Sequence, residues 1–196
     1  WMQNTALKTL NLSSNQICGA NTLCGRRQGA HTSEGVKALA SALKPNSAGL
    51  CASLTSLDVS NNEICNFVFL GKHTYTTAAV EVLAEAIAPD PHTGAFNTSL
   101  RSLSLAENYV LNNGARVLAE ALSPMPLLNG EWAHNTTLRN LNLTRNGIGG
   151  LGAGYLASML RPNGDGVYND SIDCINVTDN EDVSLLVDFD NVVIDC

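Results

Sequence analysis

The chain has 196 residues, of which 44% are hydrophobic, and a formal net charge of −7. This length suits one domain with a core of its own, and no apolar run reaches membrane-spanning length. The charge is concentrated at one end. Residues 165–196 hold nine acidic residues and no Lys or Arg, whereas residues 1–164 carry a net charge of +2. Nucleic-acid binding requires Lys and Arg, so the acidic end disfavours it, and we expect neither nucleic acid nor membrane insertion.

One short pattern occurs five times, with apolar residues at the first, fourth and sixth places and an asparagine at the ninth. The copies are LKTLNLSSNQI from Leu7, LTSLDVSNNEI from Leu54, LRSLSLAENYV from Leu100, LRNLNLTRNGI from Leu138 and IDCINVTDNEDV from Ile172. Alternation of period two predicts a strand in each copy, near residues 9–12, 56–59, 102–105, 140–143 and 174–177. The asparagines (Asn15, Asn62, Asn108, Asn146 and Asn180) are expected to bond backbone groups that have left the sheet.

A helical pattern follows each of the first four copies. The segments are Gly35–Leu43, Ala79–Ile87, Gly114–Leu122 and Gly152–Leu160. Each places core residues four apart on one helix face, and a proline soon after the last core residue ends the helix. The segment after Asp182 lacks this pattern but is rich in apolar residues. We therefore predict that residues 183–196 cap the open end of the core.

The repeated L-x-x-L-x-L-x-x-N, followed by a helix ending in L-A-x-x-L, resembles the ribonuclease-inhibitor-like class of leucine-rich repeat. The resemblance covers the chain to Asp182 and implies an α/β solenoid. This would be a horseshoe arc with parallel strands on the concave side, helices on the convex side and long insertions between elements. Five repeats would occupy residues 1–182. Nothing before Leu7 could cap the first repeat, so we expect a fragment of a longer chain. The class serves many partners, so the resemblance implies binding without naming a partner.

Repeat starts lie 47, 46, 38 and 34 residues apart, against about 20–29 for leucine-rich repeats in general. Two insertions, Cys18–Ser33 and Cys65–Thr77, separate strand from helix, and the helix-to-strand connections are long as well. Most aromatic residues lie in these extra segments, whereas the outward strand positions are small and polar. Binding hot spots favour Trp, Tyr and Arg, so we predict that the edge insertions carry the protein contacts. The candidate residues are Phe67, Phe69, Tyr75, Arg26, Arg27 and Trp132. Alternatively, aromatics such as Trp132 and Phe96 fold back under their own loops.

Other motifs point less clearly to chemistry. The segment from Gly147 to Gly152 matches G-x-G-x-x-G, but its places are set by the repeat and no second nucleotide-binding half follows, so we predict no cofactor. The six cysteines allow fifteen disulfide pairings, among them Cys18–Cys24 and Cys18–Cys65. No C-x-x-C spacing occurs and the four histidines are scattered, which argues against a metal site. No set of acids, bases and nucleophiles converges, so we predict no catalytic residue.

Three glycosylation sequons, at Asn97, Asn135 and Asn169, lie in loops that suit glycans. The sequence predicts a non-catalytic protein-protein interaction or scaffold module within a larger assembly, not an enzyme. The alternative is an extracellular or luminal recognition domain with disulfides.

Overall fold

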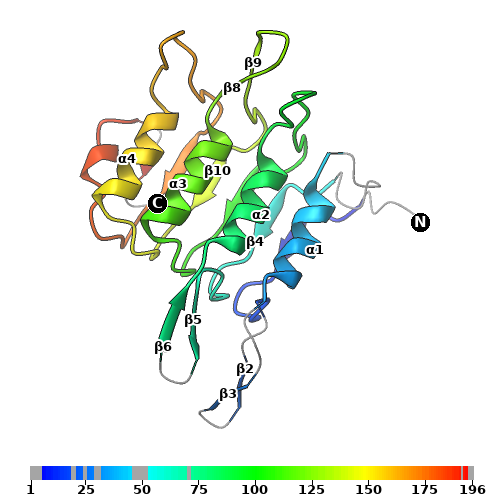
Figure 1. Cartoon of the computed structure of the whole chain (residues 1–196), viewed down its shortest axis with the longest axis vertical. Coiled ribbons are helices and arrows are strands. Elements are labelled where there is room, and N and C mark those ends of the chain that lie inside the picture. Colours follow the sequence, from blue (N-terminus) through cyan, green and yellow to red (C-terminus); the bar gives the residue numbers. More distant parts are fainter. Residues whose placement is uncertain are drawn as a thin grey trace.

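The structure is a computed structural model that describes residues 6–18, 21–23, 26–28, 32–45, 53–69, 72–190 and 192–193. Within these residues a strand followed by a helix occurs four times, and a last strand is followed by a short 3-10 helix. Figure 1 shows the four helices side by side in one layer, with the strands in a second layer behind them. No helix in this part of the chain is long and apolar enough to cross a membrane.

The strands of the repeats form one parallel sheet in the order β1–β4–β7–β10–β11–β12. Their bounds are Thr9–Asn11 (β1), Ser56–Asp58 (β4), Ser102–Ser104 (β7), Asn140–Asn142 (β10), Cys174–Asn176 (β11) and Val192–Val193 (β12). The first five strands lie where the repeated pattern predicts them, and the register aligns the same apolar position of each copy. The sixth strand, β12, was not predicted.

The helices confirm the four predicted segments. They are Glu34–Leu43 (α1), Ala78–Ile87 (α2), Leu111–Leu122 (α3) and Gly150–Met159 (α4). After α1, α2 and α3 the next residue (Lys44, Ala88 or Ser123) is extended and precedes a proline. A residue before proline avoids the helical region, which explains why these three helices end there.

The core lies between the two layers. In the third repeat Leu100, Leu103 and Leu105 are each at most 1% exposed, and burying one such side chain stabilises the fold by roughly 1.5–3 kcal/mol. The first repeat is less covered, because β1 is an edge strand of the described sheet: Leu7 is 38% exposed and Leu10 only partly buried.

At the other end of the sheet, the 3-10 helix η1 (Ser184–Leu186) packs against α4. It buries Leu186 completely, and Phe189 packs on the same core.

A ladder of asparagine side chains crosses the repeats just after the strands. The Nδ2 group of Asn108 donates to the carbonyl oxygens of Val59, Leu105 and Ala106 at 2.9–3.1 Å. Its Oδ1 atom accepts from the backbone N–H groups of Asn62 and Ile64. Asn62, Asn146 and Asn180 bond their neighbours in the same way. The predicted structural role of these asparagines is confirmed.

A second row of asparagines lies before the strands, and it corrects the expectation that Asn97, Asn135 and Asn169 suit glycans. All three are at most 5% exposed. Their Nδ2 groups donate to the last carbonyls of the preceding repeats' helices, those of Leu43, Ile87 and Leu122, at 2.7–2.8 Å. Their Oδ1 atoms accept from the backbone two and three residues ahead. A glycan is attached through Nδ2, so the folded chain leaves no room for one at these sites.

Within the described residues, three antiparallel hairpins interrupt the repeats. The pairs are β2 (Asn21–Leu23) with β3 (Arg26–Gln28), β5 (Asn66–Phe69) with β6 (Lys72–Tyr75), and β8 (Met125–Pro126) with β9 (Trp132–Ala133). The first two lie in the predicted insertions between strand and helix, and the third follows α3. In Figure 1 β2–β3 and β5–β6 extend from one edge of the molecule, while β8–β9 extends from the opposite edge.

Candidate protein-binding site

The two hairpins on one edge leave the repeats at equivalent places. Cys65 follows Cys18 by 47 residues, the same offset that pairs Thr9 of β1 with Ser56 of β4. The carbonyl of Cys18 accepts from the N–H of Thr32, and that of Cys65 from the N–H of Thr76, both at 2.8 Å. Each hairpin is therefore closed at its base by the same backbone bond, and the two stand on neighbouring repeats.

Four of the six predicted binding residues lie on these hairpins. Arg26 and Arg27 lie on β3, and the pairing of Leu23 with Arg26 puts them next to the turn. Phe67 and Phe69 lie on β5. The side chains of these four residues lie outside the described part of the chain. Their backbones place them on one edge, as the prediction of edge contacts requires.

Tyr75, the fifth predicted residue, is attached to the body of the molecule. It ends β6, packs against the core, and donates its hydroxyl to the carbonyl of Val110 at 2.7 Å. Burial raises the pKa of Tyr75 to about 12. Tyr75 therefore also has a structural role, because its hydroxyl bonds the residue that precedes α3.

Trp132, the sixth predicted residue, lies on β9 opposite Pro126 and is half-buried. Its hairpin extends from the other edge of the molecule (Figure 1). The structure therefore brings four predicted residues to one edge, with Tyr75 at the base of one of the same hairpins. Trp132 lies on the opposite edge.

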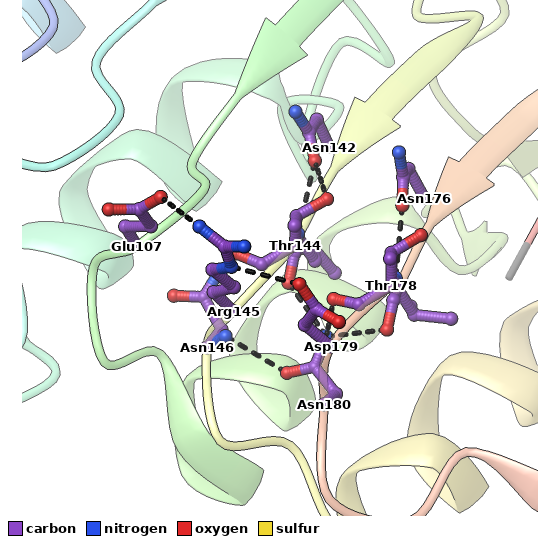
Figure 2. Close-up of polar contacts among 11 residues, drawn as sticks. Glu107, Asn142, Thr144, Arg145, Asn146, Asn176, Thr178, Asp179 and Asn180 are labelled. Carbon is purple, nitrogen blue, oxygen red and sulfur yellow. Dashed lines mark hydrogen bonds and ion pairs between the residues drawn. The ribbon is translucent and has the colours of Figure 1, made fainter. Parts of the chain in front are cut away.

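The sheet face that points away from the helices is polar and bonded to itself. Asn11 donates to the carboxylate of Asp58 at 3.0 Å, and the hydroxyls of Ser60 and Ser104 are 2.7 Å apart. Figure 2 shows a similar internal bond further along the sheet, where Asn142 Oδ1 accepts from both the backbone N–H and the hydroxyl of Thr144. Such side chains offer a partner little apolar area and few uncommitted groups.

A charged cluster next to this face was missed by the sequence analysis. Arg145 contacts Glu107 at 3.3 Å and Asp179 at 2.9 Å, which links the third, fourth and fifth copies of the repeat (Figure 2). These bonds raise the pKa of Arg145 further above its usual range. Each residue stands immediately before a ladder asparagine and has a positive φ of 54–57°. Reading that one place across successive repeats would have revealed the pairing. All three side chains are about half exposed or more, so the cluster contributes little to stability.

Two backbone amides of the G-x-G-x-x-G segment are already bonded to one side chain. The N–H groups of Gly149 and Gly152, at the start of α4, both donate to Oδ1 of Asn112 at 2.8 and 3.0 Å. The carboxylates of Glu181 and Asp182 lie beside the same loop, within 4 Å of where side chains on its glycines would begin. An anion would meet occupied amides and two negative charges there.

One group of side chains combines a hydroxyl, an imidazole and a carboxylate. Nε2 of His134 lies 3.2 Å from Asp170 and 3.5 Å from the hydroxyl of Ser171. In a nucleophilic triad the acid and the nucleophile bond opposite ring nitrogens, whereas here both contact the same one. Ser171 is also only 4% exposed. Within the described residues no group of three or more potential ligands is placed to hold a metal ion.

Comparison with known families agrees with the fold. A family model described as Leucine Rich repeat matches residues 3–18, 50–64 and 134–157. These stretches contain β1, β4 and β10 together with Asn15, Asn62 and Asn146. A search of curated proteins gave no match. Leucine-rich repeats generally mediate protein-protein interaction, which fits a non-catalytic module. The three matches and the parallel α/β architecture together support a leucine-rich repeat protein.

Proposed function

We propose that the chain is a non-catalytic interaction module of a larger assembly, and that hairpins β2–β3 and β5–β6 carry its contacts. The observation behind this proposal is their placement. They occupy equivalent insertions in neighbouring repeats and extend from the same edge, beyond the helices and the sheet (Figure 1). Two neighbouring hairpins can meet one partner together. Their sequences hold Arg26, Arg27, Phe67 and Phe69, residue types enriched at protein interfaces.

The alternative surface, the open sheet face, supports this choice by contrast. Its side chains are small, and the bonds of Asn11, Asp58, Ser60 and Ser104 are made within the face. A partner docking there would have to replace these bonds, and each exchange brings little net free energy.

A complete helix before the next sheet strand, after each of β1, β4, β7 and β10, is what the ribonuclease-inhibitor-like class has. We infer that the repeats stack into a solenoid arc with the sheet on its concave side. In this arrangement the hairpins stand on the rim of the arc. The module would act as a scaffold, holding its partner through the rim.

The test begins with cross-linking mass spectrometry in the native source, which identifies the neighbouring protein and the contacting segment together. Three variants then map the site on that protein: Phe69→Ser on β5, a double change of Arg26→Glu and Arg27→Glu on β3, and Ser102→Arg in the middle of the sheet. Losing one buried aromatic contact weakens binding by about thirtyfold. We expect losses of that size from the two hairpin variants and little change from Ser102→Arg, which adds bulk and charge to the open face.

Tyr75 enters this test only as Tyr75→Phe, because removing its whole side chain would alter the fold. Melting temperatures are measured for all variants, so that binding is compared between equally folded proteins. If Ser102→Arg abolishes binding while the hairpin variants bind normally, the sheet face is the site and the proposal is wrong.

A further inference from the structure

Helix α4 differs from the other three helices on its outer side. In α1, α2 and α3 the third place of the aligned segments is charged: Lys37, Glu81 and Arg116. The same place in α4 is Gly154, and α4 contains no charged residue from Gly150 to Met159. A helix that is apolar all round is normally covered on all sides.

Part of this surface is covered by the chain itself. A Cβ atom on Gly154 would lie 3.5 Å from Cδ1 of Leu185, so η1 packs closely across α4 at this glycine. The rest is open. Four apolar side chains around this contact are exposed: Leu151 (73%), Tyr155 (40%), Leu185 (48%) and Val187 (58%).

We group these four exposed side chains of α4, η1 and the residue that ends η1 as the α4–η1 face. Leu151 and Tyr155 are four residues apart and therefore neighbours on the helix. Leu185 joins them through its contact beside Gly154, and Val187 lies two residues further along the chain. Contiguous apolar surfaces of this kind mark interaction sites.

Carboxylates lie at both ends of α4. The carboxylate of Asp182 lies 2.9 Å from where a Cβ atom on Gly150 would be, at the start of α4, and Glu181 lies beside the neighbouring Gly149. Beyond the other end of α4 there is an open pocket of about 550 Å³, whose lining includes Tyr168, Asp170, Asp188, Phe189 and Asp190. Arg161 at this end stacks over the ring of Phe189.

We propose that the α4–η1 face docks an amphipathic helix whose apolar side carries leucines and whose flanks carry Lys or Arg. The leucines would cover Leu151, Tyr155, Leu185 and Val187, and the basic residues would face the carboxylates at both ends of α4. Nine residues separate Leu151 from Leu160 at the pocket, about 14 Å along a helix. A partner helix of about three turns therefore reaches both. A second copy of this chain fits less well, because it would bring two acidic ends together.

The proposal is tested with a fluorescein-labelled 14-residue peptide made of leucine and lysine in amphipathic helical register. Binding is followed by fluorescence anisotropy. The variant is the double change Leu151→Ser and Val187→Ser, which alters two largely exposed side chains. Leu128→Ser is the matched control, because Leu128 is equally apolar, 86% exposed and located on the β8–β9 hairpin. Melting curves check that all three proteins are folded.

We expect saturable binding to the unaltered chain and to Leu128→Ser. The double variant should bind the peptide at least about tenfold more weakly. Raising the salt concentration should weaken binding, because the carboxylates at both ends of α4 are solvent-exposed. A peptide of the same pattern with glutamate in place of lysine should not bind.

Equal binding to the double variant would show that the peptide docks elsewhere, and salt-independent binding would remove the role of the acids. Either result overturns the proposal. Sedimentation of the unaltered chain gives a further check: if it is a dimer and the double variant a monomer, a second copy covers the face instead. Hairpins β2–β3 and β5–β6 are unaltered in all three proteins, so the outcome is independent of the proposed hairpin site.

Discussion

Asn108 stands in the middle of the asparagine ladder and is completely buried. Replacing it by alanine leaves the backbone N–H groups of Asn62 and Ile64 without their acceptor and removes one of two donors from each of three carbonyls. A buried polar group left unsatisfied costs roughly 1–3 kcal/mol. We therefore expect Asn108→Ala to lower the free energy of unfolding by about 3 kcal/mol or more.

Asn15, the ladder position in the first repeat, provides the control. It is exposed, and its side chain donates to the carbonyl of Ser13. Asn15→Ala should cost under about 1 kcal/mol. Urea unfolding of both variants measures the difference. Equal losses of unfolding free energy would mean that the buried ladder bonds do not contribute the stability inferred here.

Tyr75 links stability to alkaline pH. Tyr75→Phe removes the hydrogen bond to Val110 and should lower the free energy of unfolding by about 1 kcal/mol at pH 7. The pKa of Tyr75 is raised from 10 to about 12. Between these values the unfolded chain releases the proton while the folded chain keeps it, so the contribution of the hydroxyl falls as the pH rises. The difference between the unaltered chain and Tyr75→Phe should therefore shrink from pH 10 towards pH 12.

The measurement is urea unfolding at pH 7 and pH 11, with Tyr155→Phe, which alters a 40% exposed tyrosine, as the comparison. If both phenylalanine variants behave alike at both pH values, the Val110 bond is not what holds Tyr75.

At the level of single residues, the bonding role of the ladder asparagines was predictable from the sequence. The second asparagine row was wrongly interpreted as a set of glycan sites. Asn97, Asn135 and Asn169 satisfy the sequon pattern, and their position in long connections favoured glycans. The stronger signal was their spacing, since each lies three residues before the first apolar residue of a repeat. A repeated distance points to a repeated bond. Arg145 was missed for a related reason: its partners are 38 and 34 residues away and become visible only when the copies are stacked.

Among the elements, strands and helices were predictable because burial dictates their periodicity. The hairpins were predicted only as insertions. Their strands are two to four residues long, too short to show a period. The pairing of β12 with β11 was invisible for the same reason.

The segment after Asp182 supplies the prediction at this scale. Leu186 and Phe189 pack on the core, η1 contacts α4 and β12 pairs with β11. Ending the chain after Asp182 would uncover both the last strand and one side of α4. We expect a sharp loss of solubility and a lower melting temperature.

A point variant separates this packing from simple shortening. Leu186→Ala should cost roughly 2–5 kcal/mol, because the side chain is completely buried, whereas Val187→Ala should be nearly neutral. Thermal melts and light scattering distinguish these cases. A truncated chain as stable and as monomeric as the complete one would show that the segment is no cap.

The whole molecule is a row of repeats in which each contacts mainly its neighbours, so its stability should vary along the row. Cys18 and Cys65 occupy equivalent places in the first and second repeats and report on this. Burial raises the pKa of the Cys18 thiol to about 11. Burial also raises the pKa of the Cys65 thiol, and the neighbouring Cys18 adds to this effect. Reactive thiolate is therefore scarce in the folded chain at pH 8, and alkylation must wait for opening.

We expect iodoacetamide to label Cys18 faster than Cys65, because the first repeat is open on one side within the described sheet while the second is flanked by β1 and β7. Peptide mass spectrometry over time measures both rates. Equal rates would indicate that the whole chain opens as one cooperative unit. A mass shift on reduction that maps to these two residues would instead identify a disulfide and favour the extracellular alternative.

At the same scale, the acidic end could be read directly from the sequence, but its pairing with an apolar face could not. The absence of charge in GLGAGYLASM was visible, yet an uncharged helix is equally typical of a fully buried one. Only the position of α4 beside η1 shows which of its residues remain uncovered.

The second asparagine row has a further consequence. Asn97, Asn135 and Asn169 each bond the end of a helix in the preceding repeat and hold the start of the next strand in place. The position of the next strand therefore depends little on the length of the helix-to-strand connection, which differs from repeat to repeat. Gly130 and Gly164, where a side chain would meet nothing within 4 Å, are natural grafting points. Foreign peptides spliced there would be displayed on a frame that holds its shape.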